Sequence, residues 1–195
     1  MNYLLKNEDV IGLPTDTVYG LGCLAQSSIG IDKIYKIKGR SLSKPISICV
    51  SDIDKIGLYG DISHLDSHMI NELFPGKITI VVKRQSILNP KLNPNSNLVG
   101  IRIPNCDLVR NISRINGAIA LTSANISGES SSTSVDQFES LLSKLTYVID
   151  TGSLESNLGS TVVDLSNKGY YNILRKGDDY NIFIECLEKY GLKSL

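Results

Sequence analysis

Several apolar runs of this sequence end in, or contain, hydroxyl, amide or guanidinium side chains. These polar groups are Thr15-Asp16-Thr17 after the run 10–14, Arg102 inside 100–104, Thr122-Ser123-Ala124-Asn125 after 118–121, Gly159-Ser160-Thr161 at the start of a further run, and Arg175 after 173–174. Ligands bind at the ends of strands in open α/β sheets, and clustered donors of this kind suit anions. Each group alone would be explained by a turn or a helix cap, but together they predict an anion-binding cleft.

Lys38 adds a cation to this pattern. It lies on the apolar stripe of the helix predicted over residues 29–40, a stripe that begins at Ile31. Two interpretations are open at this point. The ammonium reaches into a pocket, with Arg40 and Lys44 close behind it, or the side chain covers apolar surface and neutralises the C-terminal end of its own helix.

Other motifs for nucleotide, metal or nucleophilic chemistry are weak. The segment 75–79 lacks the upstream glycine and the following helix of a P-loop. His64 and His68 have i, i+4 spacing but no third ligand, so we expect a solvated helix face there and no zinc site. With only two histidines and no nucleophile elbow, a Ser-His-Asp triad is not indicated. The basic residues of 33–44 leave an RNA-binding module as an alternative function.

Composition and charge narrow the class of protein. The chain has 195 residues, of which 42% are hydrophobic and 21% charged, and its 20 basic and 20 acidic residues cancel. This balance is ordinary for a globular protein and argues against a general nucleic-acid-binding coat. No apolar run is long enough to span a membrane, and the first residues resemble neither a signal nor a transit peptide. The four cysteines form no metal or redox pair, so we expect a reducing, cytoplasmic location.

Strand-like and helical runs alternate, which predicts an α/β fold with a mixed parallel and antiparallel sheet. Strands are expected over 10–14, 46–50, 78–83, 98–104, 118–121, 147–150, 161–165 and 171–174, and helices over 29–40, 63–74, 108–115, 134–145 and 179–190. Ser63 is expected to cap the second helix, and Ser134 with Gln137 to form the capping box of the fourth.

The pattern also predicts the end of the chain and two loops. The last helix would bury one face and stop at Gly191, the buried residues being Ile182, Phe183, Cys186 and Leu187. Residues 85–97 and 128–133 have the composition of mobile loops.

Six motifs occur in order along the chain. They are 14–21 (PTDTVYGL), Lys38-Gly39-Arg40 with Lys44-Pro45, Pro75-Gly76-x-x-Thr79, Gly100-x-Arg102-x-Pro104, Thr122-Ser123-Ala124-Asn125-x-Ser127-Gly128 and 159–164 (GSTVVD). Together they resemble the YrdC-like family, the L-threonylcarbamoyladenylate synthases, from about residue 10 to about residue 177. The segments 38–49 and 98–104 are most similar to the short animal-type YrdC-domain proteins.

The resemblance implies a fold and a reaction. The fold is a twisted mixed sheet with flanking helices around a large, positively charged cavity. The reaction is a nucleotidyl transfer in which L-threonine, bicarbonate and ATP, with Mg²⁺, give threonylcarbamoyl-AMP and pyrophosphate, the first step of tRNA t6A37 modification. The product would pass to a separate threonylcarbamoyl transferase complex, and a weak or transient contact with tRNA is compatible with this role.

The resemblance also implies site residues. A catalytic tetrad falls on Lys38, Arg40, Ser123 and Asn125. ATP contacts fall on Arg40, Lys44, Leu98, Ser123, Ser131 and Arg175, and threonine contacts on Thr17, Cys49, Arg102, Leu121 and Ser160. No protein side chain is implied as a metal ligand. The substrates are anionic, so arginine and lysine donors suit them.

Three departures from the family pattern accompany this likeness. Cys49 stands where many members have His, Lys77 replaces a common Pro, and the chain starts only some ten residues before the first motif. We expect one YrdC-like domain over residues 1–195, without the additional C-terminal domain of longer members. The alternatives are an RNA-binding module of the same fold without catalysis, and a carbamoyltransferase like the related hydrogenase-maturation proteins, whose acylphosphatase-like and zinc domains are not expected here.

Overall fold

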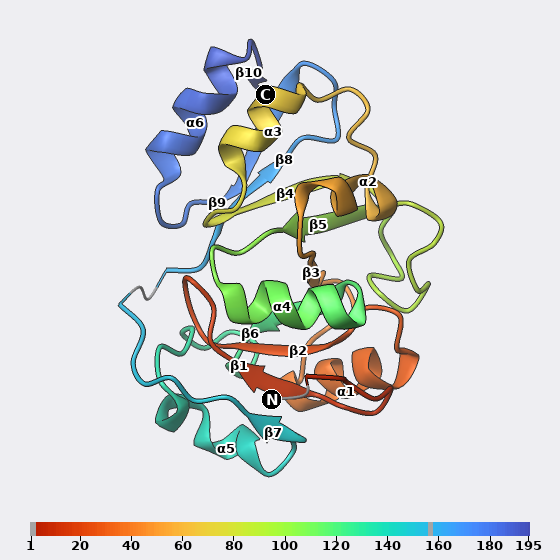
Figure 1. The fold of residues 1–195 in the computed structure, drawn as a ribbon, viewed down its shortest axis with the longest axis vertical. Coiled ribbons are helices and arrows are strands. Elements are labelled where there is room, and N and C mark those ends of the chain that lie inside the picture. Colours follow the sequence, from red (N-terminus) through yellow and green to blue (C-terminus); the bar gives the residue numbers. More distant parts are fainter. Residues whose placement is uncertain (1–2, 156–157) are drawn as a thin grey trace.

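The structure, a computed structural model, describes residues 3–155 and 158–195, so the first two residues of the domain expected over 1–195 lie outside it, as do 156–157. A ten-stranded sheet runs through the length of the molecule in the order β10-β9-β8-β4-β5-β3-β6-β2-β1-β7 (Figure 1). The strands are β1 Ile11–Leu13, β2 Gly20–Leu24, β3 Ser47–Cys49, β4 Ile78–Lys83, β5 Leu98–Arg102, β6 Ile119–Ser123, β7 Tyr147–Val148, β8 Thr161–Asp164, β9 Tyr170–Arg175 and β10 Lys193–Ser194.

Helices flank this sheet, which confirms the predicted α/β class. They are α1 Ser28–Lys38, α2 Ile56–Tyr59, α3 Ser67–Leu73, α4 Asp107–Asn116, α5 Glu139–Leu142 and α6 Tyr180–Lys189, with 3₁₀ turns η1 Ile53–Lys55 and η2 Val135–Phe138. Figure 1 shows α3 and α6 side by side at one end of the molecule, and α1 and α5 toward the other. The sheet is mixed, as expected: β3 and β5 are parallel, for example, whereas β4 and β5 are antiparallel.

The two faces of the central strands differ in polarity because side chains alternate along a strand. On one face, Ile48, Ile80, Ile101 and Ala120 belong to the main hydrophobic core. On the other face, residues that alternate with these along β3, β4, β5 and β6 line a cavity. The period-two pattern of these strands therefore produces a core and a cavity from the same segments.

Helix boundaries differ from the predictions in two places. The helix expected over 63–74 begins later, because the Asp66 carboxylate, and not Ser63, caps it by accepting from His68 N at 2.7 Å. The helix expected over 134–145 is a 3₁₀ turn followed by the short α5. Its capping box is also shifted, since Gln137 Oε1 accepts from Thr133 N at 2.8 Å and the Ser134 side chain makes no cap bond.

Three further expectations are corrected. Ile182 of α6 is 63% exposed and does not face the core, although Phe183 does. The loop 85–97 is anchored, because Arg84 donates to three of its carbonyls and two of its leucines are buried. Strand β2 was not predicted, since two of its five residues are glycines.

Candidate active site

A cavity of about 520 Å³ opens on the polar face of the sheet. Eleven of the thirteen predicted site residues line it, namely Thr17, Arg40, Lys44, Cys49, Leu98, Arg102, Leu121, Ser123, Ser131, Ser160 and Arg175. Four of these are basic, and none of the described residues that line the cavity is acidic. Lys38 and Asn125 are not part of the lining. The predicted convergence of strand-end hydroxyl and guanidinium groups is therefore observed.

Lys38 is completely buried and matches neither interpretation of its position on the helix. Its Nζ donates to the backbone oxygens of Ser123 and of Asn125, the latter at 2.5 Å. The ammonium thus ties the C-terminal end of α1 to the turn after β6. Burial, together with the nearby Arg40 charge, lowers the pKa of Lys38 to about 8.

Arg40 follows the left-handed Gly39 that ends α1, where a φ of 55° favours glycine. Its guanidinium donates from Nε to the Lys44 oxygen at 3.0 Å and from Nη2 to the Pro45 oxygen at 2.8 Å. Lys44 Nζ lies 3.3 Å from Ser127 Oγ. Residues 40–45 therefore contribute two cations to the cavity lining, and both contact neutral oxygen acceptors.

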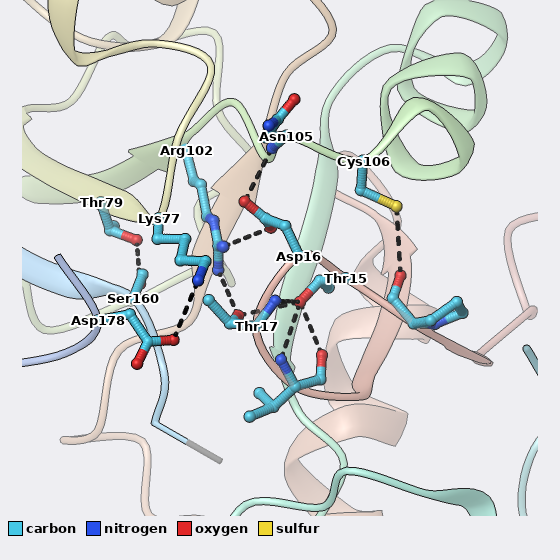
Figure 2. Close-up of polar contacts among 12 residues, drawn as sticks. Thr15, Asp16, Thr17, Lys77, Thr79, Arg102, Asn105, Cys106, Ser160 and Asp178 are labelled. Atoms are coloured by element: carbon cyan, nitrogen blue, oxygen red, sulfur yellow. Dashed lines mark hydrogen bonds and ion pairs between the residues drawn. The ribbon is translucent and has the colours of Figure 1, made fainter. Parts of the chain in front are cut away.

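Thr17 and Arg102 also line the cavity, and Figure 2 shows their side chains next to each other. Thr15 Oγ1 donates to the Val18 oxygen at 2.7 Å, so in the 3.0 Å contact between Thr15 and Thr17 the proton belongs to Thr17. Thr17 Oγ1 is then left to accept from Arg102 Nη1 at 3.1 Å. Arg102 Nη2 donates to Asp16 Oδ1 at 2.5 Å, and both side chains are at least nine-tenths buried.

Arg102 also carries a buried Nε–H that has no hydrogen-bond partner among the described residues. Buried donors without partners cost free energy, and such groups in native proteins call for an explanation. A ligand that supplies an oxygen acceptor would provide one.

Ser160 lies between Thr79 and Arg175. Its Oγ is 2.8 Å from Thr79 Oγ1 and accepts from Arg175 Nη2 at 3.1 Å, while Arg175 Nε donates to the Ser160 backbone oxygen at 2.9 Å. Arg175 can only donate. One of the two hydroxyl protons therefore makes the hydrogen bond between Ser160 and Thr79. The proton of the other hydroxyl is available for a hydrogen bond to a ligand in the cavity.

Cys49 lines the cavity from β3 as a buried free thiol. Burial raises the pKa of Cys49 to about 12. A thiol that stays protonated at neutral pH is a poor nucleophile.

Two residues outside the predicted set of site residues belong to the framework of the site. Asp16 neutralises Arg102, and Thr79 orients Ser160. Both stand inside the motifs that carried the resemblance. Thr79 could also have been found from alternation, because it is a polar residue between the apolar Ile78 and Ile80 of β4.

Metal sites and membrane spans are not found in the described parts of the chain. Within residues 3–155 and 158–195, no group of three or more His, Cys, Asp or Glu side chains could hold a metal ion. His64 uses Nε2 to contact the Leu165 oxygen at 2.8 Å, so it is partly buried and not a solvated face, whereas His68 is exposed. None of the helices in these ranges has the length and apolarity needed to cross a bilayer.

Comparison with known proteins assigns the chain to a family. The family described as "Telomere recombination" (Sua5_yciO_yrdC) matches residues 3–177. The Mus musculus threonylcarbamoyl-AMP synthase is 41% identical over 196 residues, which cover 96% of this chain and 70% of that protein. The Homo sapiens threonylcarbamoyl-AMP synthase is 39% identical over 196 residues, which again cover 96% of this chain and 70% of that protein.

A solved structure agrees with these relatives. The crystal structure of P. abyssi Sua5 complexed with L-threonine superposes with a TM-score of 0.87 at 25% identity and covers 96% of this chain. This chain spans 56% of the length of that one. The motifs, the fold and the relatives agree, and the chain belongs to the Sua5/YciO/YrdC family.

Proposed function

We propose that this protein is a threonylcarbamoyl-AMP synthase, which converts L-threonine, bicarbonate and ATP into threonylcarbamoyl-AMP and pyrophosphate. The relatives with this name align over 96% of the chain. The observation that carries the proposal is the cavity of about 520 Å³, which four basic side chains line and which contains no acidic side chain of the described residues. Pockets of this size accept nucleotide-sized ligands.

The ATP end is assigned to Arg40, Lys44, Ser123, Ser131 and Arg175, with backbone contacts near Leu98. Arg40 presents a planar fork and Lys44 a point charge, two complementary ways to bind phosphate oxygens. Their present partners are neutral oxygens, so neither charge is cancelled by a carboxylate in those contacts.

The threonine end is assigned to Thr17, Arg102 and Ser160, with Leu121 and Cys49 beside them. The unpartnered Arg102 Nε–H and the spare proton of the Thr79–Ser160 pair are donors for the oxygens of an amino acid. Lys38 and Asn125 support the ATP end, because Lys38 holds the turn that follows Ser123.

The chemistry needs positioning and charge stabilisation more than a protein nucleophile. The threonine amine combines with bicarbonate to form a carbamate and water. A carbamate oxygen then attacks the α-phosphorus of ATP, and pyrophosphate leaves. Arg40, Lys44 and Arg175 stabilise the charge that develops on the phosphate oxygens, and the two ends of the cavity hold the reactants in line.

Mg²⁺ would enter with the triphosphate as part of the substrate and supply further charge neutralisation. Since the described cavity lining offers hydroxyls and backbone oxygens but no carboxylate, the phosphate oxygens would be its main ligands. The reaction would take place in the cytoplasm, and the adenylate would pass to a separate transferase that modifies tRNA, with at most a transient contact between this chain and RNA.

Pyrophosphate release from ATP tests the proposal directly. Pyrophosphate and an AMP-containing product should form only when threonine and bicarbonate are both present, and tRNA should not be required. Equal release of pyrophosphate without threonine would reject the assignment.

A further inference from the structure

Two segments without regular secondary structure contribute to the ATP end of the cavity. The segment 40–45 supplies Arg40 and Lys44 to the lining, and the loop 85–97 supplies Ser96, directly before β5. Both described segments lie outside the helices and strands, so the hydrogen bonds of the sheet do not hold them. Other contacts must fix how the two segments lie relative to each other.

The side chain of Asn93 joins the two segments. Asn93 is 2% exposed, and both polar atoms of its carboxamide are bonded to the backbone of Ile46. Oδ1 accepts from Ile46 N at 2.7 Å, and Nδ2 donates to the Ile46 oxygen at 2.9 Å. A residue of a neighbouring antiparallel strand makes the same pair of bonds. The carboxamide therefore holds the backbone at the point where the segment 40–45 enters β3.

The start of the segment 40–45 is linked to the same carboxamide through Tyr35. The Tyr35 hydroxyl lies 3.4 Å from Asn93 Oδ1, and the Tyr35 backbone oxygen accepts from Arg40 N at 2.9 Å. The Arg40 guanidinium then donates to two backbone oxygens at the far end of the segment. Both ends of the segment are therefore connected to Asn93.

The backbone of Asn93 also orders the end of its own loop. The Asn93 oxygen accepts from Ser96 N at 3.0 Å, and Ser96 Oγ accepts from Leu98 N at 3.0 Å. The φ of Asn93 is 55°, in the left-handed region that asparagine adopts more readily than most residues. One buried residue thus connects the segment 40–45 with residues 96–98, and both contribute to the cavity lining.

We propose that Asn93 is a positioning residue for ATP binding, because its carboxamide holds the segment 40–45 in the arrangement in which Arg40 and Lys44 bind the triphosphate. The inference rests on the proposed function, in which these two cations bind ATP. Asn93 acts through them and is not itself part of the described cavity lining. Without the carboxamide, the N–H and oxygen of the buried Ile46 lose these partners, and the segment adopts other arrangements in which the two charges no longer converge.

Asn93→Gly tests this role, because it removes the carboxamide and keeps a residue that adopts a positive φ without strain. In the pyrophosphate assay its KM for ATP should rise about tenfold, as expected if the segment 40–45 keeps the binding arrangement for about a tenth of the time. The KM for threonine should stay within about twofold, because the threonine end is built on other segments. Amide hydrogen exchange over residues 41–46 should be faster than in the unmodified protein.

Asn89→Gly is the matched control, because Asn89 belongs to the same loop. Its Nδ2 donates to the Gln26 oxygen at 2.8 Å and to Ser28 Oγ at 3.0 Å, so its carboxamide attaches the loop to the start of α1 and not to the segment 40–45. Asn89→Gly should change the KM for ATP by no more than about twofold and should leave hydrogen exchange over residues 41–46 unchanged.

Three results would overturn the proposal. They are an unchanged KM for ATP in folded Asn93→Gly protein, an equal rise of the KM values for ATP and threonine, and an equal rise of the KM for ATP in Asn89→Gly. If Asn93→Gly does not fold, Asn93→Asp replaces it, since a carboxylate accepts from Ile46 N but cannot donate to the Ile46 oxygen. An unchanged KM for ATP in Asn93→Asp then overturns the proposal.

The role of Asn93 can be separated from the function on which it rests. If the unmodified protein makes no threonylcarbamoyl-AMP, the proposed function fails. Titration calorimetry with ATP and Mg²⁺ then decides the role of Asn93. Weaker binding by Asn93→Gly than by the unmodified protein and Asn89→Gly is expected, and equal affinities of the three proteins would reject the role.

Discussion

The Lys38 ammonium is bonded to the backbone oxygen of Asn125 at 2.5 Å, although 87 residues separate them in the chain. The same Nζ donates to the Ser123 oxygen. In return, Ser127 N donates to the Lys38 backbone oxygen at 2.9 Å. The end of α1 and the turn after β6 are therefore one unit, and the two cavity segments that follow them, 40–45 and 123–131, are placed relative to each other by a buried cation.

Lys38→Met should destabilise the protein in a pH-dependent way. Two buried carbonyls lose their donor, at a cost of about 1–3 kcal/mol each. The pKa of Lys38 is lowered to about 8 from 10.5, so between these values the unfolded chain holds a proton that the folded protein has released. Stability then rises with pH. The free energy of unfolding of the wild-type protein relative to Lys38→Met should therefore increase from pH 8 to pH 10, as measured by urea denaturation.

Lys36→Met is the control for this series, because Lys36 is exposed on the same helix. The free energy of unfolding of Lys36→Met should equal that of the wild-type protein at every pH. A difference between wild-type and Lys38→Met that is constant from pH 7 to pH 10 would show that Lys38 does not titrate in this interval.

Arg40→Ala should lower turnover by roughly 10²–10³-fold, because a charged hydrogen-bond partner of the transition state is typically worth about 2–4 kcal/mol. The fold should survive, since Arg40 follows the end of α1 and contacts loop oxygens, not the core. Arg40→Lys keeps the charge but lacks the planar guanidinium fork, so its turnover should lie between those of the wild-type protein and Arg40→Ala. Full turnover of folded Arg40→Ala protein would remove Arg40 from the proposed site.

Threonine should be preferred over serine, and serine far over valine. Serine lacks one methyl group, which is worth roughly 10–200-fold in kcat/KM, whereas a site built to bind a hydroxyl rejects the isostere without one by as much as ~10⁴-fold. Ser160→Ala should raise the KM for threonine more than the KM for ATP. Equal kcat/KM for valine and threonine would contradict this placement of the amino acid.

The Thr79–Ser160 contact adds a structural control to that series. Thr79→Val removes one hydroxyl with little change in shape, and the two side chains are 2.8 Å apart. Effects of contacting residues are not additive, with coupling energies of about 0.5–3 kcal/mol. The double variant should therefore lose less threonine affinity than the two single losses predict.

Asp16→Ala should be strongly destabilising. It leaves the buried Arg102 charge without its carboxylate, and breaking a buried pair in this way costs about 3–5 kcal/mol. The KM for threonine should rise as well, because Arg102 loses its orientation. Asp52→Ala is the control, since its pairs with Arg110 and Arg114 are partly exposed and should contribute about 1 kcal/mol or less. Equal stabilities of the two variants, measured by urea denaturation, would count against the buried pair.

The sequence alone determined the class of fold, the alternation that separates core from cavity, and the strand ends that carry donors. These features are local: period-two patterning and polar residues that follow apolar runs are visible in short windows. Most site residues could be named in this way together with the ordered motifs, and eleven of the thirteen line one cavity.

Only the tertiary structure decided how these groups are paired. Three hydrogen bonds show this: Lys38 to the turn after β6, Arg102 to Asp16, and Thr79 to Ser160. Each joins two residues that are more than eighty positions apart in the chain. Such pairs depend on strand order and side-chain direction, which no short window contains.

Strand β2 is a second feature that a short window of sequence does not predict. Glycine is a weak strand former, so Gly20 and Gly22 hide the strand in the sequence. In the sheet, a Cβ at Gly20 would lie 2.8 Å from Leu121 Cδ1 of the neighbouring β6. The absence of a Cβ at Gly20 gives the Leu121 side chain room to pack this closely against β2. Packing against a distant segment, and not local propensity, makes residues 20–24 a strand and brings the motif 14–21 to the edge of the cavity.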